Sequence, residues 1–248
     1  MINNQKLVTV LLLNYKRPEN LVEIIKALKS QTIPCDIFLW NNSDKTFENH
    51  NLDLIINSSE NLKCWPRWSM ASFAQTPYIM THDDDLCFTS NDCLERLIET
   101  HKKHEHPGLG IGFNGVKLSK TGNYYPTKNQ KKIRSLGIMV GPKHVKFPKK
   151  DTKVDIVKGR LIFCKKSDLI NVPLFVQNDG DRFDDIVISS YLAKKQLGRH
   201  LVTSCLNKKI KELPGGDGGM ALSSDENWEN QRTSISKIYF PEKQHNTR

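Results

Sequence analysis

Apolar residues along the first hundred positions form two patterns, continuous runs and helix-spaced stripes. Residues 7–13 read Leu-Val-Thr-Val-Leu-Leu-Leu, which predicts a central parallel strand covered on both faces. Behind Pro18, apolar residues recur at i, i+3, i+4 and i+7 in residues 21–28, which predicts an amphipathic helix that begins at the proline. Further strands are predicted at 36–40, 54–56 and 78–81, and a helix at 65–73. This alternation of strands and helices predicts a Rossmann-like, nucleotide-binding arrangement.

The pattern is weaker in the second half of the chain. One more clear helix is predicted to begin at Thr89 or Ser90, with Leu94, Leu97 and Ile98 on its buried side. Residues further along are assigned as follows: strands at 110–113, 154–157, 161–163 and 201–202; a loop-rich, lysine-rich insertion at 115–152, with or without a hairpin; a helix at 184–197 that Gly198 ends; a glycine-rich hinge at 215–219; and a last helix near 225–239.

These elements predict an α/β protein with a mixed, mostly parallel sheet flanked by helices. The chain has 248 residues, enough for one large domain or two small ones, and no clear linker divides it. The formal net charge of +10 indicates an anionic partner. Nucleotide diphosphates, acidic glycans, a membrane surface and nucleic acid all fit that charge.

Two observations bear on the compartment. The apolar run at 7–13 is too short to span a bilayer, and no signal-peptide cleavage pattern follows it. The six cysteines form no CxxC pair and no zinc-like spacing, so reduced thiols in the core are expected. We therefore expect a cytoplasmic protein, with a peripheral membrane contact left open.

The most informative motif is the acidic triplet Asp83-Asp84-Asp85, which directly follows the predicted strand 78–81. Three adjacent carboxylates repel one another unless positive charge lies between them. A hard divalent cation is the favoured partner, because such ions bind carboxylate oxygens and share substrate phosphates. The alternative is a solvated acidic loop. The position at a strand end favours the metal, since α/β sheets bind ligands there.

Polar residues follow two other strands. Asn14 to Arg17 end the first strand and Asn41 to Asp44 end the second, so both groups should line the same crevice. Asparagine amides can bind a base or a ribose, and Arg17 could reach a phosphate. Taken alone, these are ordinary turn residues. Neither a GxxxxGK[ST] loop nor a GxGxxG motif is present, which argues against ATP-type phosphoryl transfer and weakens a dinucleotide interpretation.

A second acidic cluster begins the helix predicted at 184–197. Carboxylates at a helix start complement the helix dipole, and for one of Asp184 and Asp185 this role is expected to suffice. The other is expected to project into the crevice and accept a proton from a hydroxyl nucleophile. The four tryptophans are expected to pack in the core or against helices rather than to bind a sugar, and Trp228, in the C-terminal segment, is the best candidate for an exception.

Five segments resemble GT-A glycosyltransferases. They cover most of the chain outside 115–152, and the DxD motif becomes specific through its position between the others. The segments are Val8–Pro18, which resembles the opening strand and turn of family 2 enzymes and of exostosin catalytic domains; Leu39–Asn42, similar to the exostosin version; Asp83–Asp85, which matches the DxD metal motif; Phe183–Ile186, which resembles the [ED]-D pair; and Leu222–Ser224 with Arg232 and Ile238–Phe240, similar to the exostosin C-terminal segment.

The resemblance implies one GT-A domain over 1–248, with a nucleotide-binding half at 1–105 and an acceptor-binding half at 106–248. It implies a glycosyltransferase that moves a hexosyl or N-acetylhexosaminyl group from a nucleoside-diphosphate sugar, a UDP-sugar above all, to a hydroxyl of a glycan or lipid-linked glycan. Such an enzyme would serve polysaccharide biosynthesis and use Mn²⁺ or Mg²⁺. The implied roles are donor binding by Asn14, Arg17, Asn42, Arg67, Asp83, Asp84 and Arg232; metal binding by Asp85 and Asp83; and catalysis by Asp185 with Asp184.

Other functions remain open at this point. A sugar-nucleotide nucleotidyltransferase would share the Rossmann-like half and the metal, but its usual glycine-rich loop is absent. A basic nucleic-acid binder would need aromatic residues among the lysines, and the insertion has few. Stereochemistry is also open, because exostosin-like enzymes retain the anomeric configuration and family 2 enzymes invert it. His82 departs from the family pattern, in which an apolar residue precedes the triplet.

Overall fold

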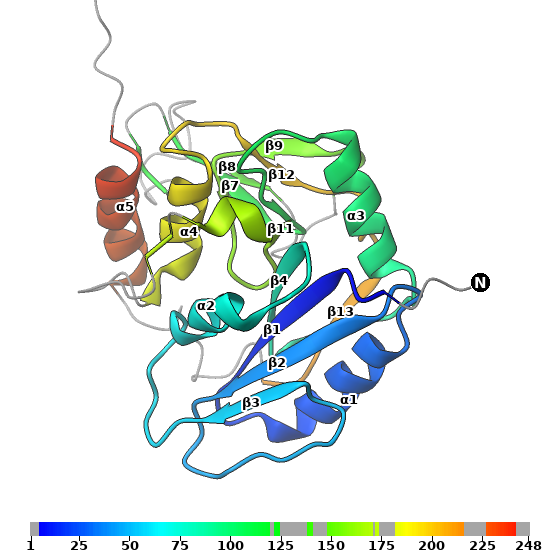
Figure 1. Ribbon diagram of the computed structural model, residues 1–248. Helices are drawn as coiled ribbons and strands as arrows, with labels where there is room; N and C mark the ends of the chain where they lie inside the picture. The colour runs from blue at the N-terminus through cyan, green and yellow to red at the C-terminus, as the bar shows by residue number, and fades with distance from the viewer. Residues whose placement is uncertain are drawn as a thin grey trace, which may run out of the picture.

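An eight-stranded sheet runs through the centre of the protein (Figure 1). The computed structural model describes residues 5–119, 122–124, 138–140, 148–170, 172–173, 182–215 and 227–241. In spatial order the strands are β3 (Leu54–Asn57), β2 (Cys35–Asn41), β1 (Val8–Asn14), β4 (Tyr78–Asp83), β11 (Phe163–Lys165), β6 (Ile111–Gly112), β12 (His200–Val202) and β9 (Thr152–Val154).

The strands β3, β2, β1 and β4 form a parallel block. β11 then pairs antiparallel with β4, so the sheet continues without a break into the second half of the chain. Of the seven pairings in the sheet, four are parallel and three are antiparallel. The predicted α/β class with a mixed, mostly parallel sheet is confirmed, and the finer assignment to the GT-A fold stays a prediction.

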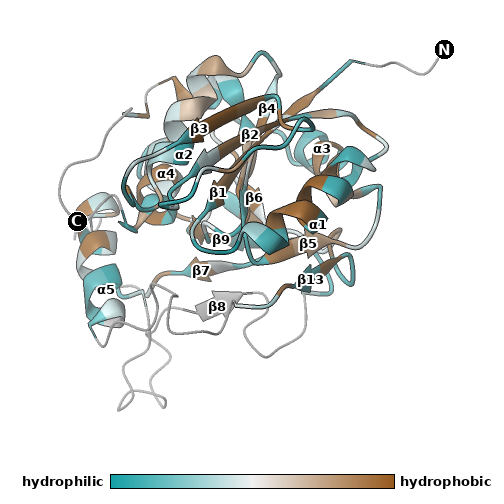
Figure 2. Ribbon diagram, turned by 90° about the horizontal axis from the view of Figure 1, so that it is seen from below, coloured by the Kyte–Doolittle hydropathy of each residue, from teal (hydrophilic) through white to brown (hydrophobic). Residues whose placement is uncertain are grey.

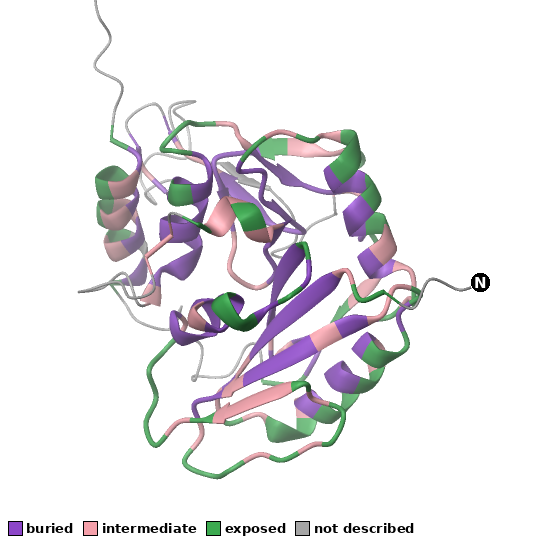
Figure 3. Cartoon of the chain, in the orientation of Figure 1, coloured by how far each residue is buried: buried purple, intermediate pink, exposed green. Residues whose placement is uncertain are grey.

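Helices cover both faces of the sheet. They are α1 (Pro18–Lys29), α2 (Pro66–Ser69), α3 (Cys93–Lys103), α4 (Asp184–Leu192) and α5 (Trp228–Tyr239). Leu12 of β1 packs in a core with α1 and α3, whereas Leu11 packs in a second core with α2 and α4. Successive side chains of a strand point to opposite faces, which explains why the whole run is apolar. Figure 2 shows apolar residues along the strands, and Figure 3 shows β1 and β4 almost entirely buried.

Two small sheets complete the fold. β10 (Ile156–Val157), β7 (Gly115–Lys117) and β8 (Ile138–Val140) form an antiparallel sheet, and β13 (Ile210–Glu212) pairs with β5 (Leu86–Phe88). The β7–β8 pair agrees with the hairpin that was left open for the insertion. Neither β5 nor β13 was predicted. Their pairing brings a late segment of the chain next to the acidic triplet, because β5 begins directly after Asp85.

Three predicted boundaries were wrong. The helix expected at 184–197 ends at Leu192, because Lys194 and Lys195 adopt left-handed backbone conformations with φ of 48° and 62°. The helix expected at 65–73 changes after Ser69 into a 3-10 helix. The residue before α3 is Asp92 rather than Thr89 or Ser90, since the Ser90 hydroxyl donates to the Asp92 carboxylate instead of capping the helix.

Two further expectations can be compared with the structure. All six cysteines are free thiols, and four of them are buried, as expected for reduced core residues. Among the described residues, no helix is both long and apolar enough to cross a membrane. Residues 216–219 of the predicted hinge and most of the insertion lie outside the described residues.

Candidate active site

The carboxyl ends of β1, β2 and β4 lie side by side at one edge of the parallel block. In the strand register, Leu13 pairs with Asp83 and Asn14 pairs with Asn41. The sheet therefore brings Asn14, Asn41 and the first aspartate of the triplet to one place, as the sequence predicted. This edge is where open α/β sheets bind ligands.

A row of asparagines crosses this edge. The amide of Asn14 donates to Asn41 Oδ1 over 2.7 Å, and the amide of Asn41 donates to Asn57 Oδ1 over 2.7 Å. Asn14 Oδ1 also accepts from the backbone N–H of Arg17 over 3.3 Å. Asn14 and Asn41 are fully buried. Their amides fix the three strand ends relative to one another. The edge at which Asn14 is predicted to bind a base is therefore rigid.

Asn42 holds the loop that follows β3. Its Oδ1 accepts from the Trp40 indole and from the backbone N–H of Leu62, both over 3.1 Å, and its amide donates to the carbonyl of Lys63 over 2.8 Å. Asn42 is 3% exposed. The structure places it at the predicted edge, but its side-chain groups are engaged within the protein. A direct contact with a base stays a prediction.

Each aspartate of the triplet pairs with a different arginine. These guanidinium groups supply the positive charge that was predicted to come from a metal ion. Repulsion among the three carboxylates therefore does not by itself require a metal. Two of the three arginines were candidate donor-binding residues, and the third, Arg160, was not. The pairs are Asp83 with Arg67 at 2.6 Å, Asp84 with Arg17 at 2.5 Å and Asp85 with Arg160 at 3.1 Å.

Asp84 anchors the turn between β1 and α1. Its Oδ2 accepts from the backbone N–H of Tyr15 over 2.9 Å and its Oδ1 accepts from Arg17. Its backbone carbonyl accepts from the Asn20 amide over 2.8 Å. Burial raises the pKa of Asp84 to about 6, although Arg17 opposes the shift. Both carboxylate oxygens of this residue accept hydrogen bonds within the protein, and its predicted contact with a sugar-nucleotide donor stays a prediction.

Arg67 joins the triplet to the start of α4. It is 1% exposed, and it donates to Asp83 Oδ1 over 2.6 Å and to Asp184 Oδ2 over 2.8 Å. Burial opposes its charge, but the two carboxylates outweigh burial and raise its pKa. Burial alone would raise the pKa of Asp83, and Arg67 more than offsets this, so Asp83 titrates below its ordinary value. One guanidinium therefore connects two motifs that are 101 positions apart.

Close packing around Arg67 requires a glycine at position 159. The carbonyl of Gly159 accepts from Arg67 Nη2 over 3.0 Å. A Cβ atom on this residue would lie 3.1 Å from Arg67 Nη2 and 3.1 Å from Asp184 Oδ1. Any larger residue would push against the ion pair.

The two acidic residues at the start of α4 point to different partners. Asp184 Oδ2 accepts from Arg67 and, over 2.8 Å, from the indole N–H of Trp68. Asp185 Oδ1 accepts from the backbone N–H of Ile186 over 2.9 Å, which is the helix-start role, and its Oδ2 binds Arg232. Burial raises the pKa of Asp184, and Arg67 opposes the shift. Both residues lie at the candidate site, with Asp184 on the triplet side.

Arg232 connects α5 to α4. Its Nη2 donates to Asp185 and, over 2.7 Å, to the hydroxyl of Tyr124. Its guanidinium lies 4.3 Å from the ring centroid of Tyr124 and 5.2 Å from that of Trp228. Arg232 is 4% exposed. Trp228, which the sequence set apart from the other tryptophans, is buried and packs against Phe183 and Arg232. A contact of Arg232 with a diphosphate stays a prediction.

The donor set of Asp83 and Asp85 fits a divalent cation. Asp83 Oδ1 and Asp85 Oδ1 bind arginines, while the Oδ2 atom of each accepts no hydrogen bond from a described residue. Burial raises the pKa of Asp85, and the charge of Asp83 raises it further. Within the described part of the chain, no group of three or more His, Cys, Asp or Glu side chains could hold an ion. Two carboxylates with phosphates and water are a typical Mg²⁺ arrangement.

His82, the departure from the family pattern, behaves as a core residue. It is 1% exposed, its Nδ1 lies 2.8 Å from the carbonyl oxygen of Asp83, and its ring packs edge-on against Phe88. Burial lowers its pKa to about 4, so the imidazole is neutral near pH 7. It therefore fills the place of the usual apolar residue.

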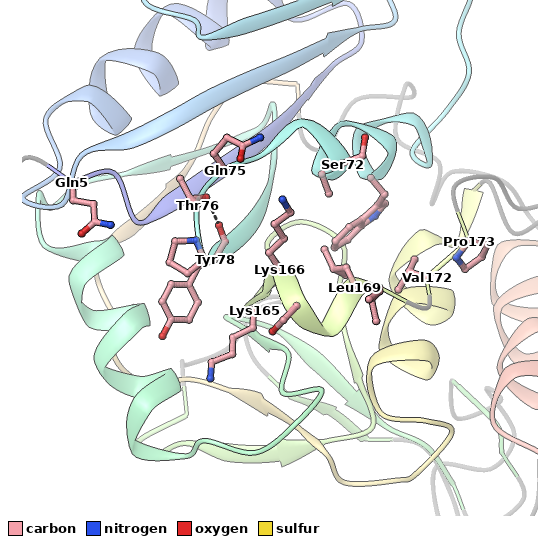
Figure 4. A pocket seen from close by; sticks show the side chains of 15 residues that line it. Gln5, Ser72, Gln75, Thr76, Tyr78, Lys165, Lys166, Leu169, Val172 and Pro173 are labelled. Carbon is pink, nitrogen blue, oxygen red and sulfur yellow. Dashed lines mark hydrogen bonds between the residues drawn. The ribbon is translucent and has the colours of Figure 1, made fainter.

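An apolar groove of about 1060 Å³ is lined in part by Trp68 (Figure 4). It runs between the 3-10 helix Met70–Phe73 and the 3-10 helix Lys166–Leu169, and it opens beside Tyr78. Tyr78 is the first residue of β4, whereas the triplet lies at the other end of that strand. The groove is therefore separated from the triplet.

Sequence reasoning missed three residues of the site, Arg160, Trp68 and Gly159. Trp68 follows Arg67, but a tryptophan in a predicted helix is usually a packing residue. Gly159 and Arg160 lie together between two short predicted strands, where a turn accounts for both. Nothing in the spacing of the chain links Arg160 to an aspartate 75 positions earlier.

Comparison with known proteins adds no family. A scan of the chain against models of protein families gives no match, and a search of curated proteins finds no significantly similar sequence.

Proposed function

We propose that this protein is a metal-dependent glycosyltransferase that moves a sugar from a nucleoside-diphosphate sugar, a UDP-sugar above all, to a hydroxyl of a glycan or lipid-linked glycan. The observation that carries the proposal is the bridge made by Arg67 between Asp83 and Asp184. It joins the acidic triplet, resembling a DxD motif, to the acidic pair expected to act on the acceptor side. Both motifs lie at the edge where α/β sheets bind ligands.

The electrostatics of the site suit a diphosphate donor. Arg17 and Arg160 flank the triplet, and guanidinium groups bind phosphate oxygens through two parallel hydrogen bonds. The net charge of +10 favours the approach of an anionic substrate. The resemblance to exostosin and family 2 enzymes supports the assignment of these groups to the donor.

The proposed reaction exchanges one bond at the anomeric carbon for another. The bond from that carbon to the diphosphate oxygen breaks, and a bond from the acceptor oxygen to the same carbon forms. The acceptor hydroxyl loses its proton, which Asp185 accepts in this proposal. Arg232, bound to Asp185, orients that carboxylate and adds positive charge beside the departing diphosphate.

Asp83 and Asp85 would hold a divalent cation, Mn²⁺ or Mg²⁺, through their Oδ2 atoms. The cation would supply charge neutralisation for the leaving diphosphate. Arg67 keeps Asp83 ionised, and the backbone N–H of Leu213 donates to the carbonyl of Asp85 over 2.8 Å. These two contacts orient the aspartates before any ligand arrives.

The test is UDP binding by calorimetry with and without Mn²⁺, followed by hydrolysis of a panel of UDP-sugars. We expect Mn²⁺-dependent UDP binding that Asp85→Asn abolishes. Glu99→Gln is the matched control, because Glu99 is an exposed carboxylate of α3 whose ion pair is with the exposed Arg96. UDP binding that survives both Asp85→Asn and removal of the metal contradicts the proposal. Turnover of UTP with a sugar 1-phosphate, and release of pyrophosphate, would instead favour the nucleotidyltransferase.

A further inference from the structure

Arg160 lies beside the acidic triplet although neither the motif pattern nor the resemblance includes it. It lies in the turn between β10 and β11, and its Nη2 donates to Asp85 Oδ1 over 3.1 Å. Its backbone carbonyl accepts from the N–H of Asp83 over 3.0 Å. The guanidinium carbon is 5.6 Å from the ring centroid of Phe113, which supports it from one side. Backbone and aromatic contacts thus fix this residue at the triplet.

The guanidinium of Arg160 has a donor to spare. Its Nη1 donates over 2.7 Å to Glu212, a residue of β13 whose side chain is 58% exposed. Its Nε is buried and has no hydrogen-bond acceptor among the described residues. A buried N–H without an acceptor is costly, so a negatively charged oxygen atom that reached Nε would be bound favourably.

Arg17 repeats this arrangement at the opposite flank of the triplet. Its Nη1 donates to Asp84, its Nη2 donates to the carbonyl of Gly215 over 2.7 Å, and its Nε is also buried without an acceptor in the described residues. Two guanidinium groups with unused donors therefore bind adjacent aspartates of the triplet, Arg17 on Asp84 and Arg160 on Asp85.

We propose that Arg160 binds the diphosphate of the donor together with Arg17, and that Asp85 is its counter-ion in the absence of substrate. This inference rests on the function proposed above. Two guanidinium groups can each present two parallel donors to the oxygens of a diphosphate. Glu212 holds Nη1 from the solvent side, so Arg160 keeps its place when Nη2 turns from Asp85 to a phosphate oxygen.

Calorimetry with three probes separates a diphosphate contact from a structural role. Uridine, UDP and inorganic pyrophosphate are titrated, with Mn²⁺, into the full-length wild type, Arg160→Ala and Arg160→Lys. We expect Arg160→Ala to weaken UDP and pyrophosphate binding by about 10- to 100-fold, because charge-assisted hydrogen bonds are lost. Uridine binding is expected to stay unchanged, and Arg160→Lys to lie between wild type and Arg160→Ala.

Two further variants test whether a change in affinity is specific to Arg160. Arg96→Ala removes an arginine whose side chain is 52% exposed and whose ion pairs are with Asp92 and Glu99 around α3, so it should change none of the three affinities. Glu212→Gln keeps an oxygen acceptor for Nη1 of Arg160 but removes a negative charge beside the site. It should tighten UDP binding by about two- to fivefold. This second variant tests the proposal even if Arg160→Ala does not fold.

The outcomes are distinct. A wild type that binds neither UDP nor pyrophosphate overturns the proposed function, and this inference with it. A wild type that binds both, combined with an Arg160→Ala variant that binds them equally well, overturns this inference alone. Equal losses for uridine and UDP would also overturn it, because they indicate a general distortion of the site.

Discussion

The strands of the parallel block are four to seven residues long, whereas β6, β9, β10, β11 and β12 have two or three residues each. In the parallel block, strand register places the site residues, because Asn14 and Asn41 are paired positions of adjacent strands. In the second half, long-range ion pairs do so: Arg67 with Asp184, Arg160 with Asp85 and Arg232 with Asp185.

The difference shows that the two halves contribute different properties to one site. Long parallel strands give a rigid edge whose shape is held by strand pairing and asparagine amides, and the Arg17–Asp84 ion pair anchors the turn after β1. Short strands position a side chain less strictly, so α4 and the β10–β11 turn are fixed by charged groups from the other half. The acidic residues thus have a structural task as well as the proposed chemical one.

Arg67→Met should cost the most, about 3–5 kcal/mol of unfolding free energy, because it leaves the buried Asp184 and the half-buried Asp83 without their shared partner. Urea unfolding at pH 7 measures it. Arg96→Met, which breaks only exposed ion pairs, should cost less than about 1 kcal/mol. A loss below about 1 kcal/mol for Arg67→Met as well would mean that the ion pairs do not hold the second half in place.

Core truncations should cost the same in both halves. Leu12 in β1 and Ile156 in β10 are both fully buried, so Leu12→Ala and Ile156→Ala should each cost about 3 kcal/mol. Equilibrium unfolding in denaturant gives both values. A much smaller cost for Ile156→Ala would indicate that the second half is loosely packed, and that its weak sequence pattern reflects weak packing.

Acid should weaken the second half through His200. This residue is fully buried; its Nδ1 accepts from the backbone N–H of Gly110 over 3.0 Å, and its Nε2 lies 2.8 Å from the carbonyl oxygen of Ser189. Burial lowers its pKa from 6.5 to about 4. The unfolded chain therefore binds the extra proton first, so the contribution is complete above pH 6.5 and is lost as the pH falls toward 4.

The expected loss from His200 is about 2–3 kcal/mol between pH 6.5 and 4. Unfolding curves at a series of pH values give the slope, and His200→Gln should reduce it although the variant starts less stable. An unchanged slope in His200→Gln would assign the acid sensitivity to other groups, such as the buried His82 of the first half.

The smallest expected loss of stability comes from removing hydrogen bonds that tryptophan indoles donate. Trp68→Phe removes a donor to the carboxylate of Asp184 across the two halves, and should cost about 1.5–3 kcal/mol. Trp40→Phe removes a donor to the neutral amide of Asn42 within the first half, and should cost about 1 kcal/mol. Thermal unfolding of the two variants measures the difference. The reverse order would show that charge across the halves matters less than position.

The sequence predicted the parallel block well, because its elements carry local patterns. The buried residues of α1 are Leu21, Ile24, Ile25 and Leu28, the same four that the helical spacing indicates. Strands of two or three residues carry almost no periodicity, so β5 and β13 were not found. The end of α4 was misplaced because left-handed conformations at two lysines are not visible in a sequence.

The candidate site could be predicted only as far as its motifs. Asn14, Asp83 and Asp185 were found because they follow strands or begin a helix. Their partners were harder to find, because an ion pair between distant residues depends on the fold rather than on spacing. The counter-ions of the triplet in the structure are arginine side chains rather than a metal ion. Which counter-ions are present depends on packing, and the acidic triplet alone does not reveal it.

Arg67 also limits how this protein could be engineered. The same guanidinium holds the two halves together and keeps the proposed metal ligand Asp83 ionised. Stability and the proposed turnover are therefore tied to one side chain and cannot be adjusted separately there. Substitutions that aim at higher thermal stability are better placed on the exposed surfaces of α1 and α3, away from Arg67.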